Sequence, residues 1–275
     1  MEIMELIKDA FVFPSKNAKV LLIYIILTIL ASVFAVMGAI VYALGIIVPE
    51  YFMWGGIAAI IALLIGWVMS GYMISVIKSG IDLDDKVPEF VWWDNFITGF
   101  NSFIVSIVYF LIPAFIVVVV GVATNVFGNI YIVAQEFYSQ ILNVYMGYSS
   151  AIAMEALSQA MVNLVFSLTI TLTAAVVVFV IFSFIQTMAE ARLANTGSLG
   201  EALNVLESAK DIRRIGIGKT IAVIILIFIV VGIINAILSF IFGYVPLLSI
   251  LSLFISPYLV LFTQRAVGLL YSDIA

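Results

Sequence analysis

The chain has 275 residues, of which 65% are hydrophobic and only 10% are charged, and its formal net charge is −5. Soluble domains carry about a quarter charged residues, so this composition excludes a soluble fold and leaves no basic surface for nucleic acid. The absence of cysteine and histidine excludes disulfides, thiolate and imidazole metal sites, and histidine-based acid–base catalysis.

Residues 3–11 place apolar side chains at helical spacing with charged residues opposite, and Pro14 ends the pattern. This predicts a short amphipathic helix at the membrane interface. The first twenty residues have neither a basic segment nor a cleavage site, so no removable signal peptide is expected. Two apolar runs follow, at about 20–48 and 52–77, each long enough to cross a hydrocarbon core roughly 30 Å thick.

Small residues recur every four positions in both of these runs. Such stripes let helix backbones approach closely in lipid, so the two runs are predicted to form a tight hairpin. The first stripe is Ala31, Ala35, Ala39 and Ala43, and the second is Ala58, Ala62, Gly66 and Ser70.

The polar stretch 78–100 contains five acidic residues beside the pair Trp92 and Trp93. Tryptophan is enriched where a membrane meets water, so both are predicted to be interface anchors. The acidic cluster is interpreted as a solvated turn, because it lacks the loop glycine and distal glutamate of an EF-hand calcium loop.

Four further spans are predicted from apolar runs, at about 100–122, 161–188, 217–242 and 245–262. Residues 124–160 are less apolar and are predicted to form an amphipathic helix on the far surface. Prolines in two of the spans predict kinks that expose backbone carbonyls. Seven residues of these spans are therefore candidates to line a polar cavity: Ser106, Tyr109, Pro113, Asn235, Ser252, Ser256 and Pro257.

Ser198 and Glu201 have the spacing of a capping box, which predicts an amphipathic helix over 199–214. Its polar face carries Glu201, Asn204, Ser208, Asp211 and Arg214. The cations at its end, Lys210, Arg213 and Arg214, complement the helix dipole and suit anionic headgroups. They are predicted to be interface anchors.

All eleven basic residues fall in the terminal segments or in the loops after the second and fourth spans. The positive-inside rule therefore places both termini in the cytoplasm of a multi-pass cell-membrane protein. The fold class is all-α, with six transmembrane helices plus interfacial helices in one membrane domain, 1–275. Each cytoplasmic segment precedes two spans, which predicts three related hairpins at 1–78, 79–195 and 196–275.

Residues 71–113, with PEFVWWDNFITGF at 88–100 leading into IVYFLIPA at 107–114, resemble an uncharacterised family of prokaryotic, largely archaeal, polytopic membrane proteins. The later TGSLGEAL at 196–203 is similar to the family's second cytoplasmic element. The matching positions are Pro88, Glu89, Phe90, Trp93, Asp94, Pro113, Thr196, Gly197 and Ser198. The resemblance implies fold and topology, and it brings no activity.

The sequence indicates a non-enzymatic membrane protein without cofactor, because its charged residues fall in loops or at span ends and no histidine is present to activate the serine of the triplet 147–149. The predicted role is a scaffold or accessory subunit whose amphipathic helices engage the bilayer or a membrane or cytoplasmic protein partner. The alternative is an uncoupled small-solute channel, facilitator or exporter component.

Overall fold

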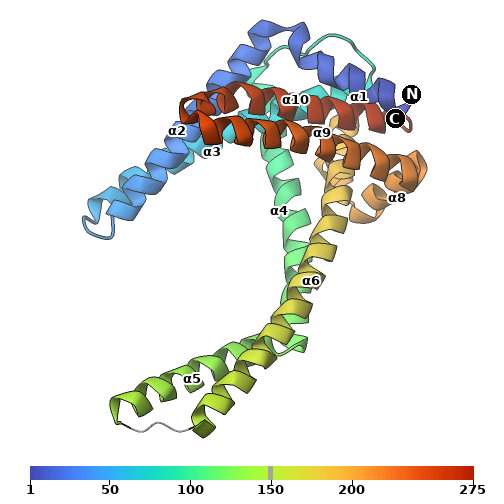
Figure 1. Cartoon of the computed structure of the whole chain (residues 1–275). Coiled ribbons are helices and arrows are strands. Elements are labelled where there is room, and N and C mark those ends of the chain that lie inside the picture. Colours follow the sequence, from blue (N-terminus) through green and yellow to red (C-terminus); the bar gives the residue numbers. More distant parts are fainter. Residues whose placement is uncertain (148–150) are drawn as a thin grey trace. The chain divides into compact units, whose positions relative to one another are not determined.

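The computed structural model describes residues 1–147 and 151–275, without the side chains of 151–153. In this part every regular element is a helix (Figure 1), which confirms the all-α class. The elements in order are α1 (Ile3–Val12), η1 (Phe13–Lys16), α2 (Ala18–Leu44), α3 (Glu50–Ile81), α4 (Trp92–Ala123), α5 (Val126–Tyr145), α6 (Ala151–Thr196), α7 (Leu199–Ala202), α8 (Val205–Ile215), α9 (Ile217–Tyr244), η2 (Pro246–Leu251) and α10 (Ser252–Tyr271).

Six of these helical segments are long and apolar enough to cross a membrane, which confirms the predicted number of spans. They are Ala18–Leu44, Glu50–Ile81, Trp92–Ala123, Met154–Thr196, Ile217–Tyr244 and Pro246–Tyr271. Pro113 and Pro257 both lie inside helices. The kinks expected at these two prolines stay predictions.

The chain divides into two compact units. Unit 1 comprises residues 1–106 and 185–275, and unit 2 comprises residues 107–184. The apolar pattern of the sequence predicted one membrane domain, 1–275, and does not mark the boundary between these units. Each is described by itself.

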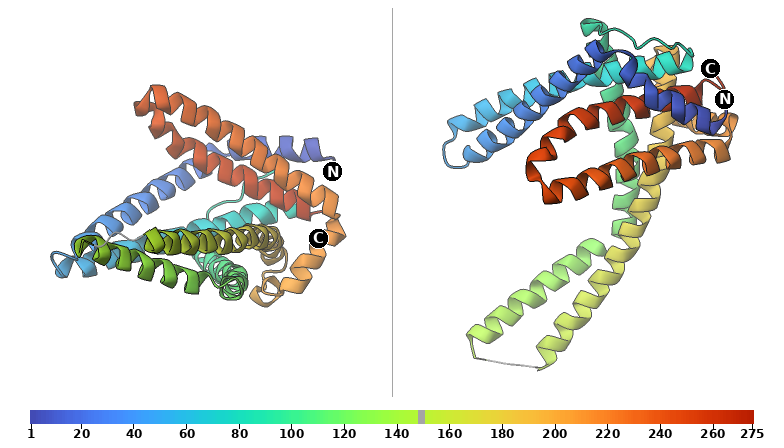
Figure 2. Two further views of the ribbon diagram at one scale, coloured as in Figure 1. Left: turned by 60° about the horizontal axis from the view of Figure 1, so that its bottom comes forward. Right: turned by 45° about the horizontal axis from the view of Figure 1, so that its top comes forward.

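In unit 1, α2 and α3 form the predicted antiparallel hairpin (Figure 2). Their backbones approach closely at two glycines. An added Cβ on Gly38 would lie 3.1 Å from the backbone nitrogen of Ala59, and one on Gly55 would lie 2.5 Å from the backbone nitrogen of Tyr42. The alanine stripe of the first span does not make these contacts, because Ala35 and Ala39 are exposed. The hairpin was predicted correctly, but the residues chosen for its first helix were wrong.

Glycines also allow α3 to approach α10 and α4 in unit 1. An added Cβ on Gly80 would lie 2.8 Å from the Cα of Gly268, and one on Gly268 would overlap the carbonyl oxygen of Ile77. At the crossing with α4, a Cβ on Gly71 would overlap the carbonyl oxygen of Asn95. Backbones this close gain dispersion contacts that larger side chains would prevent.

The N-terminal helix α1 packs against α10. Leu6, Ala10 and the following Phe13 are fully buried, and the hydroxyl of Tyr258 donates to the carbonyl of Phe11. The N-terminal amine lies 3.8 Å from a carboxylate oxygen of Asp273. The predicted helix is therefore present, its inner face is covered by protein, and the two termini lie beside one another.

Unit 2 contains α5 and the adjoining parts of α4 and α6. The hydroxyls of Thr124 and Thr171 are 2.8 Å apart, and the side-chain amide of Asn129 donates to the hydroxyl of Ser167 at 3.0 Å. Hydroxyl and amide pairs of this kind are the polar contacts expected between helices in lipid.

The predicted single amphipathic helix over 124–160 was wrong in extent. The structure has α5, which ends at Tyr145, and α6, which begins at Ala151. Gly147, with φ +76°, follows α5 in a conformation that favours glycine. The other two residues of the triplet 147–149 lie outside the described residues.

The three predicted repeats differ in their leading segments. Helix α1 precedes the α2–α3 hairpin, and α8 precedes α9 and α10. The middle repeat has no such helix, because residues 82–91 form a loop and α4 begins directly at Trp92. The superposition of the three hairpins stays a prediction.

Candidate functional site

Two short helices, α7 and α8, replace the single amphipathic helix predicted over 199–214. The hydroxyl of Ser198 accepts the backbone N–H of Glu201 at 3.4 Å, as predicted for the N-cap. The carboxylate of Glu201 pairs with Arg192 instead of returning to Ser198. Asn204 then caps a new helix by accepting the N–H of Glu207 at 3.2 Å, so the chain turns between α7 and α8.

The polar side of α8 faces the rest of unit 1. Ser208 and Asp211 are 0% and 1% exposed. One carboxylate oxygen of Asp211 accepts from the Arg192 guanidinium and from the Tyr271 hydroxyl, both at 2.9 Å. The other oxygen accepts from Arg214 at 2.6 Å. These bonds attach α8 to the ends of α6 and α10.

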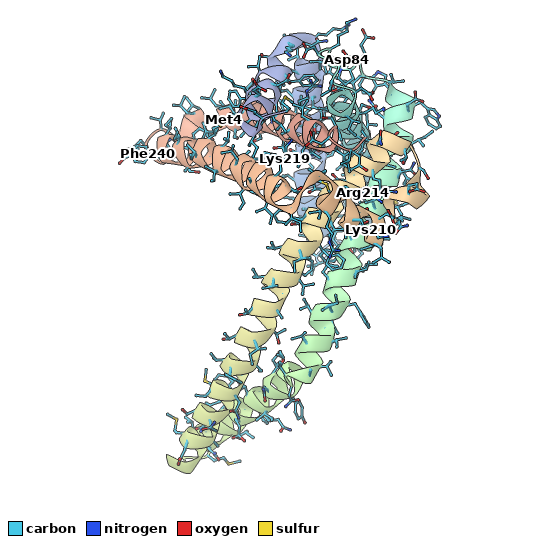
Figure 3. All side chains as sticks on the ribbon, turned by 90° about the vertical axis from the view of Figure 1, so that its right-hand side faces the viewer. Met4, Asp84, Lys210, Arg214, Lys219 and Phe240 are labelled. Carbon is cyan, nitrogen blue, oxygen red and sulfur yellow. The ribbon has the colours of Figure 1, made fainter. Side chains whose placement is uncertain are left out.

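The outer side of α8 therefore combines one large apolar residue with the basic ones. Leu206 is 74% exposed, and Lys210, Arg213 and Arg214 are exposed as well; Figure 3 labels Lys210 and Arg214 of this helix. Ser208 and Asp211, which were predicted to share the polar face of this segment with Arg214, are buried, whereas Arg214 is exposed.

Ion pairs along α8 change the pKa values of Glu207, which is partly buried, and of the exposed Arg214. The pKa of the Glu207 carboxyl is lowered, first by the hydrogen bond from Lys210 and also by Arg214. The pKa of the Arg214 guanidinium is raised, first by its hydrogen bond to Asp211. Within the described residues, Arg213 has no ion pair, so its charge is the least compensated on this surface.

A second buried ion pair centres on Arg265 in α10, which is 1% exposed. Its guanidinium donates to Asp9 at 3.2 Å, to the Ser79 hydroxyl at 3.3 Å and to the Asp84 carbonyl at 2.8 Å. It also lies 4.3 Å from the Phe13 ring centroid. One side chain thus joins α1, η1, α3 and the loop after α3 to the last helix.

The charged side chains were predicted to fall in loops or at span ends, and that prediction said nothing about their burial. Arg265 and Asp211 are both buried. Their partners come from segments far apart in the sequence, and only the fold brings them together. The sequence offered two signals for these sites. Arg265 is the one basic residue after the last apolar run, and Asp211 lies on the polar face of the predicted helix over 199–214.

The acidic loop after α3 is held by these contacts. Asp82 pairs with Lys78 at 2.7 Å, and Asp85 pairs with Lys16 at 3.1 Å; Figure 3 labels Asp84 of this loop. No group of three or more acidic side chains that could hold a metal is found in the described part of the chain. Asp82 and Asp85 serve as ion-pair partners, and the carboxylate of Asp84 accepts the backbone N–H of Lys86.

Trp92 and Trp93 begin α4, and both are exposed. Trp92 lies 5.5 Å from the ring of Phe90, and Trp93 stacks on Phe96 at 5.7 Å. Their exposure at a span end is the position expected of an aromatic belt. The anchoring role stays a prediction.

The predicted cavity residues are only partly brought together. Asn235 and Ser256 line one groove of about 250 Å³ between α9 and α10, together with Thr263 and Gln264, but Ser252 and Pro257 are not part of it. Ser252 donates to the carbonyl of Ser249 in its own segment.

The other three predicted cavity residues lie in α4. Ser106, in unit 1, accepts from Gln186 at 3.2 Å, and the same amide donates to Glu190 at 3.1 Å. Tyr109 and Pro113, in unit 2, are buried. Ser106 thus takes part in a chain of hydrogen bonds that includes Glu190. This carboxylate lies near the end of a span and was not among the predicted site residues.

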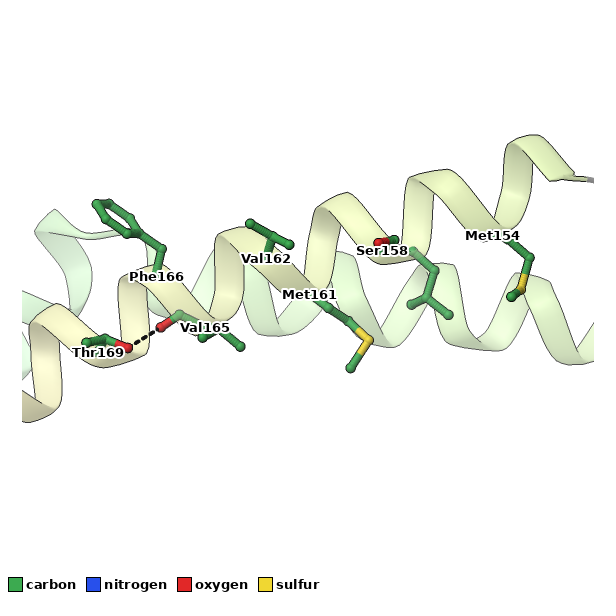
Figure 4. A pocket seen from close by; sticks show the side chains of 8 residues that line it. Met154, Ser158, Met161, Val162, Val165, Phe166 and Thr169 are labelled. Atoms are coloured by element: carbon green, nitrogen blue, oxygen red, sulfur yellow. Dashed lines mark hydrogen bonds between the residues drawn. The ribbon is translucent and has the colours of Figure 1, made fainter.

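An apolar surface groove of about 650 Å³ lies along the N-terminal half of α6 in unit 2. Figure 4 shows Met154, Met161, Val165 and Phe166 on it, with the Thr169 hydroxyl bonded to the carbonyl of Val165. None of the predicted site residues lies on this surface.

The all-helical fold and its six apolar spans define an integral, multi-pass membrane protein. Residues 54–243 match the family described as "Protein of unknown function (DUF4013)", and the chain belongs to this family. This agrees with the predicted membership of an uncharacterised family. No curated protein and no solved structure matches the chain.

Proposed function

We propose that the protein is a non-enzymatic scaffold or accessory subunit of the cell membrane, with both termini in the cytoplasm. In this role it holds α8 against the anionic headgroups of the inner leaflet. The observation that carries the proposal is the orientation of α8. Its polar side is bonded to unit 1 through Asp211, and its outer side presents Leu206 with Lys210, Arg213 and Arg214.

An outer face of this composition fits a membrane interface. An apolar residue inserts at the boundary between headgroups and acyl chains while basic residues contact the phosphates. Each basic residue near an anionic surface contributes about 1 kcal/mol. Since Lys210 and Arg214 share their charge with Glu207, Arg213 is expected to contribute most.

The distribution of charge supports the same orientation. All eleven basic residues lie in unit 1, and residues 107–184 contain none. The termini lie beside one another, which agrees with an even number of spans, since an even number places both termini on the same side of the membrane. Under the positive-inside rule the basic ends of the helices face the cytoplasm.

A single-cysteine experiment tests the proposal, because the chain has no native cysteine. Leu206→Cys would carry an environment-sensitive dye, and its emission would be measured in nanodiscs with and without anionic lipid. We expect a blue shift with anionic lipid that Arg213→Gln reduces and that Lys8→Gln, an exposed basic residue of α1, leaves unchanged. Identical emission in both lipid mixtures would contradict the proposal.

One observation favours the alternative, an uncoupled solute facilitator or exporter component. The groove between α9 and α10 places Asn235, Ser256, Thr263 and Gln264 along one polar strip. If this strip conducts small solutes, Asn235→Leu should slow their entry into proteoliposomes while the exposed Ile237→Leu does not. Equal entry rates for parent, variants and protein-free vesicles would remove this alternative.

A further inference from the structure

A pocket of about 410 Å³ lies in unit 1, where α3, the loop after it, α4 and the end of α6 meet. Its volume is within the range of small-molecule sites, roughly 300–1,000 Å³. The pocket brings together the two stretches that the sequence analysis singled out. Pro88 comes from the stretch that begins PEF, and Gly197 comes from TGS at 196–198.

The loop that forms one wall is fixed by two buried side chains. The hydroxyl of Tyr72, a residue with no exposed surface, donates to the carbonyl of Pro88 at 3.0 Å, and its ring stacks on Phe90 with centroids 4.0 Å apart. Arg265 donates to the carbonyl of Asp84 at 2.8 Å. A wall held in this way loses little conformational freedom when a ligand binds.

The polar lining carries two cations and two anions. Lys78, in the last turn of α3, and Asp82, which directly follows α3, form a 2.7 Å ion pair, and both side chains are half-exposed. Such a pair contributes only about 0–1 kcal/mol, so each member is available to a ligand of opposite charge. Lys86 has no ion pair among the described residues, and Asp84 accepts the backbone N–H of Lys86 at 3.0 Å.

A buried amide behind the lining has an unused donor. Asn95 is 2% exposed, and its carbonyl oxygen accepts from the Ser75 hydroxyl, which lines the pocket. The Nδ2 group of Asn95 has no partner within the described residues. An unpaired buried donor costs about 1–3 kcal/mol. Asn95 itself is not part of the pocket lining, so the hydroxyl of Ser75 is the polar group of this pair that a ligand can reach.

The remaining wall is apolar. Ile74 belongs to the last turns of α3, and Leu193 and Ala194 belong to the last turns of α6. Both helices are candidate spans, so the pocket lies where a polar headgroup changes into an apolar chain. A soluble ligand would make no use of that boundary, whereas a lipid would use both sides of it.

We propose that this pocket binds the phosphoethanolamine headgroup of a membrane lipid. Lys78 and Lys86 contact the phosphate, Asp82 and Asp84 contact the ammonium group, and the Ser75 hydroxyl donates to a phosphate oxygen. Ile74, Leu193 and Ala194 contact the beginning of the acyl chains. A purely anionic headgroup would leave two carboxylates facing its negative charge, and a purely cationic ligand would face two ammonium groups, so a ligand with both charges fits best.

Lipid binding to the purified full chain in detergent tests the proposal, with native mass spectrometry as the readout. The probes are diacyl phosphatidylethanolamine, phosphatidylcholine, phosphatidylglycerol and free phosphoethanolamine. We expect phosphatidylethanolamine to bind tightest, because phosphatidylcholine has no N–H to donate to Asp82 and phosphatidylglycerol has no ammonium group. Weak binding of free phosphoethanolamine would assign the site to the lipid, and equally tight binding would assign it to the soluble compound.

Variants separate this site from general lipid contact. Lys86→Gln should weaken phosphatidylethanolamine binding roughly tenfold, since a charge-assisted hydrogen bond is lost. Asp82→Asn with Asp84→Asn should remove the preference over phosphatidylglycerol. Lys8→Gln, on α1 and outside the pocket lining, should leave both unchanged. Equal affinity for all three lipids in the parent, or equal effects of Lys86→Gln and Lys8→Gln in correctly folded protein, would overturn the proposal.

Discussion

Units 1 and 2 are both built from apolar helices, yet they carry different polar groups. Unit 1 contains every basic residue and both buried charged networks, centred on Asp211 and Arg265. Unit 2 has two acidic residues, Glu136 and Glu155, and no basic one. Its cross-helix bonds use hydroxyls and amides, as at Thr124 and Thr171.

Buried ion pairs and hydroxyl pairs differ in how many neighbouring polar groups they need in order to be stable. A buried ion pair is stable only when several hydrogen bonds compensate for lost hydration, and unit 1 supplies such partners from loops and helix ends. A hydroxyl pair needs no such support. Unit 1 should therefore be sensitive to single changes at its buried charges, and unit 2 should tolerate changes to its polar pairs.

The largest effect is expected for Arg265→Ala. It leaves Asp9, the Ser79 hydroxyl and the Asp84 carbonyl without their shared donor, and breaking a buried pair in this way typically costs about 3–5 kcal/mol. Unfolding of the purified protein, followed by tryptophan fluorescence, measures it. Arg213→Ala, which removes an exposed arginine, is the matched control. A variant as stable as this control would show that the Arg265 network is not essential to unit 1.

A smaller effect is expected for Gly268→Ala, at the crossing of α3 and α10. The new methyl group would overlap the carbonyl of Ile77 and lie 2.9 Å from the Cα of Gly80, and overpacking of this kind costs about 1–3 kcal/mol. Gly66→Ala is the control, because its Cβ would meet no atom within 4 Å. The control should keep or slightly raise stability, since alanine favours helix. Equal stability of the two variants would contradict the close crossing.

The sequence predicted the helical class and the six spans because long apolar runs have few alternatives in lipid. The helix boundaries were harder to predict. Helix α4 begins at Trp92, within a stretch assigned to the interface, because capping and tertiary contacts rather than hydropathy decide where a helix starts.

The residues of the charged sites could be predicted only in part. The basic residues of α8 are exposed as expected, but Asp211 points inward because Arg192 and Tyr271 lie beside it. Such partners are set by packing between segments far apart in the sequence, and no local pattern reveals them. Packing also decides which residues line the groove at Asn235 and Ser256. Ser252 and Pro257 were predicted to line the same polar cavity but are not part of this groove.

The polar contact within unit 2 should be worth much less than those of unit 1. Thr124→Val, Thr171→Val and the double variant form a cycle that isolates the 2.8 Å hydroxyl contact. Bonds of this type in membrane proteins average about 0.6 kcal/mol, so a coupling near that value is expected in denaturant or SDS titrations. A coupling above about 2 kcal/mol would mean that unit 2 also depends on single polar contacts.

The smallest effect is expected at the surface of α8. The pKa of Glu207 is lowered in the folded protein from a reference value of 4.5, chiefly by Lys210. A carboxyl with a lowered folded pKa contributes stability above its unfolded pKa and loses it as the pH falls through its folded pKa. The contribution of Glu207 should thus be complete above about pH 4.5 and decline below it.

Hydrogen exchange of residues 205–215, corrected for the intrinsic pH dependence, measures this contribution. The comparison between the parent and Glu207→Gln isolates the one carboxyl from Asp211 and the other acids nearby. The two proteins should differ above pH 4.5 and converge in more acidic buffer, because protonated Glu207 no longer attracts Lys210 or Arg214. A constant difference across the acidic range would mean that Glu207 acts through packing and hydrogen-bond geometry, and that charge on the outer side of α8 does not stabilise the helix.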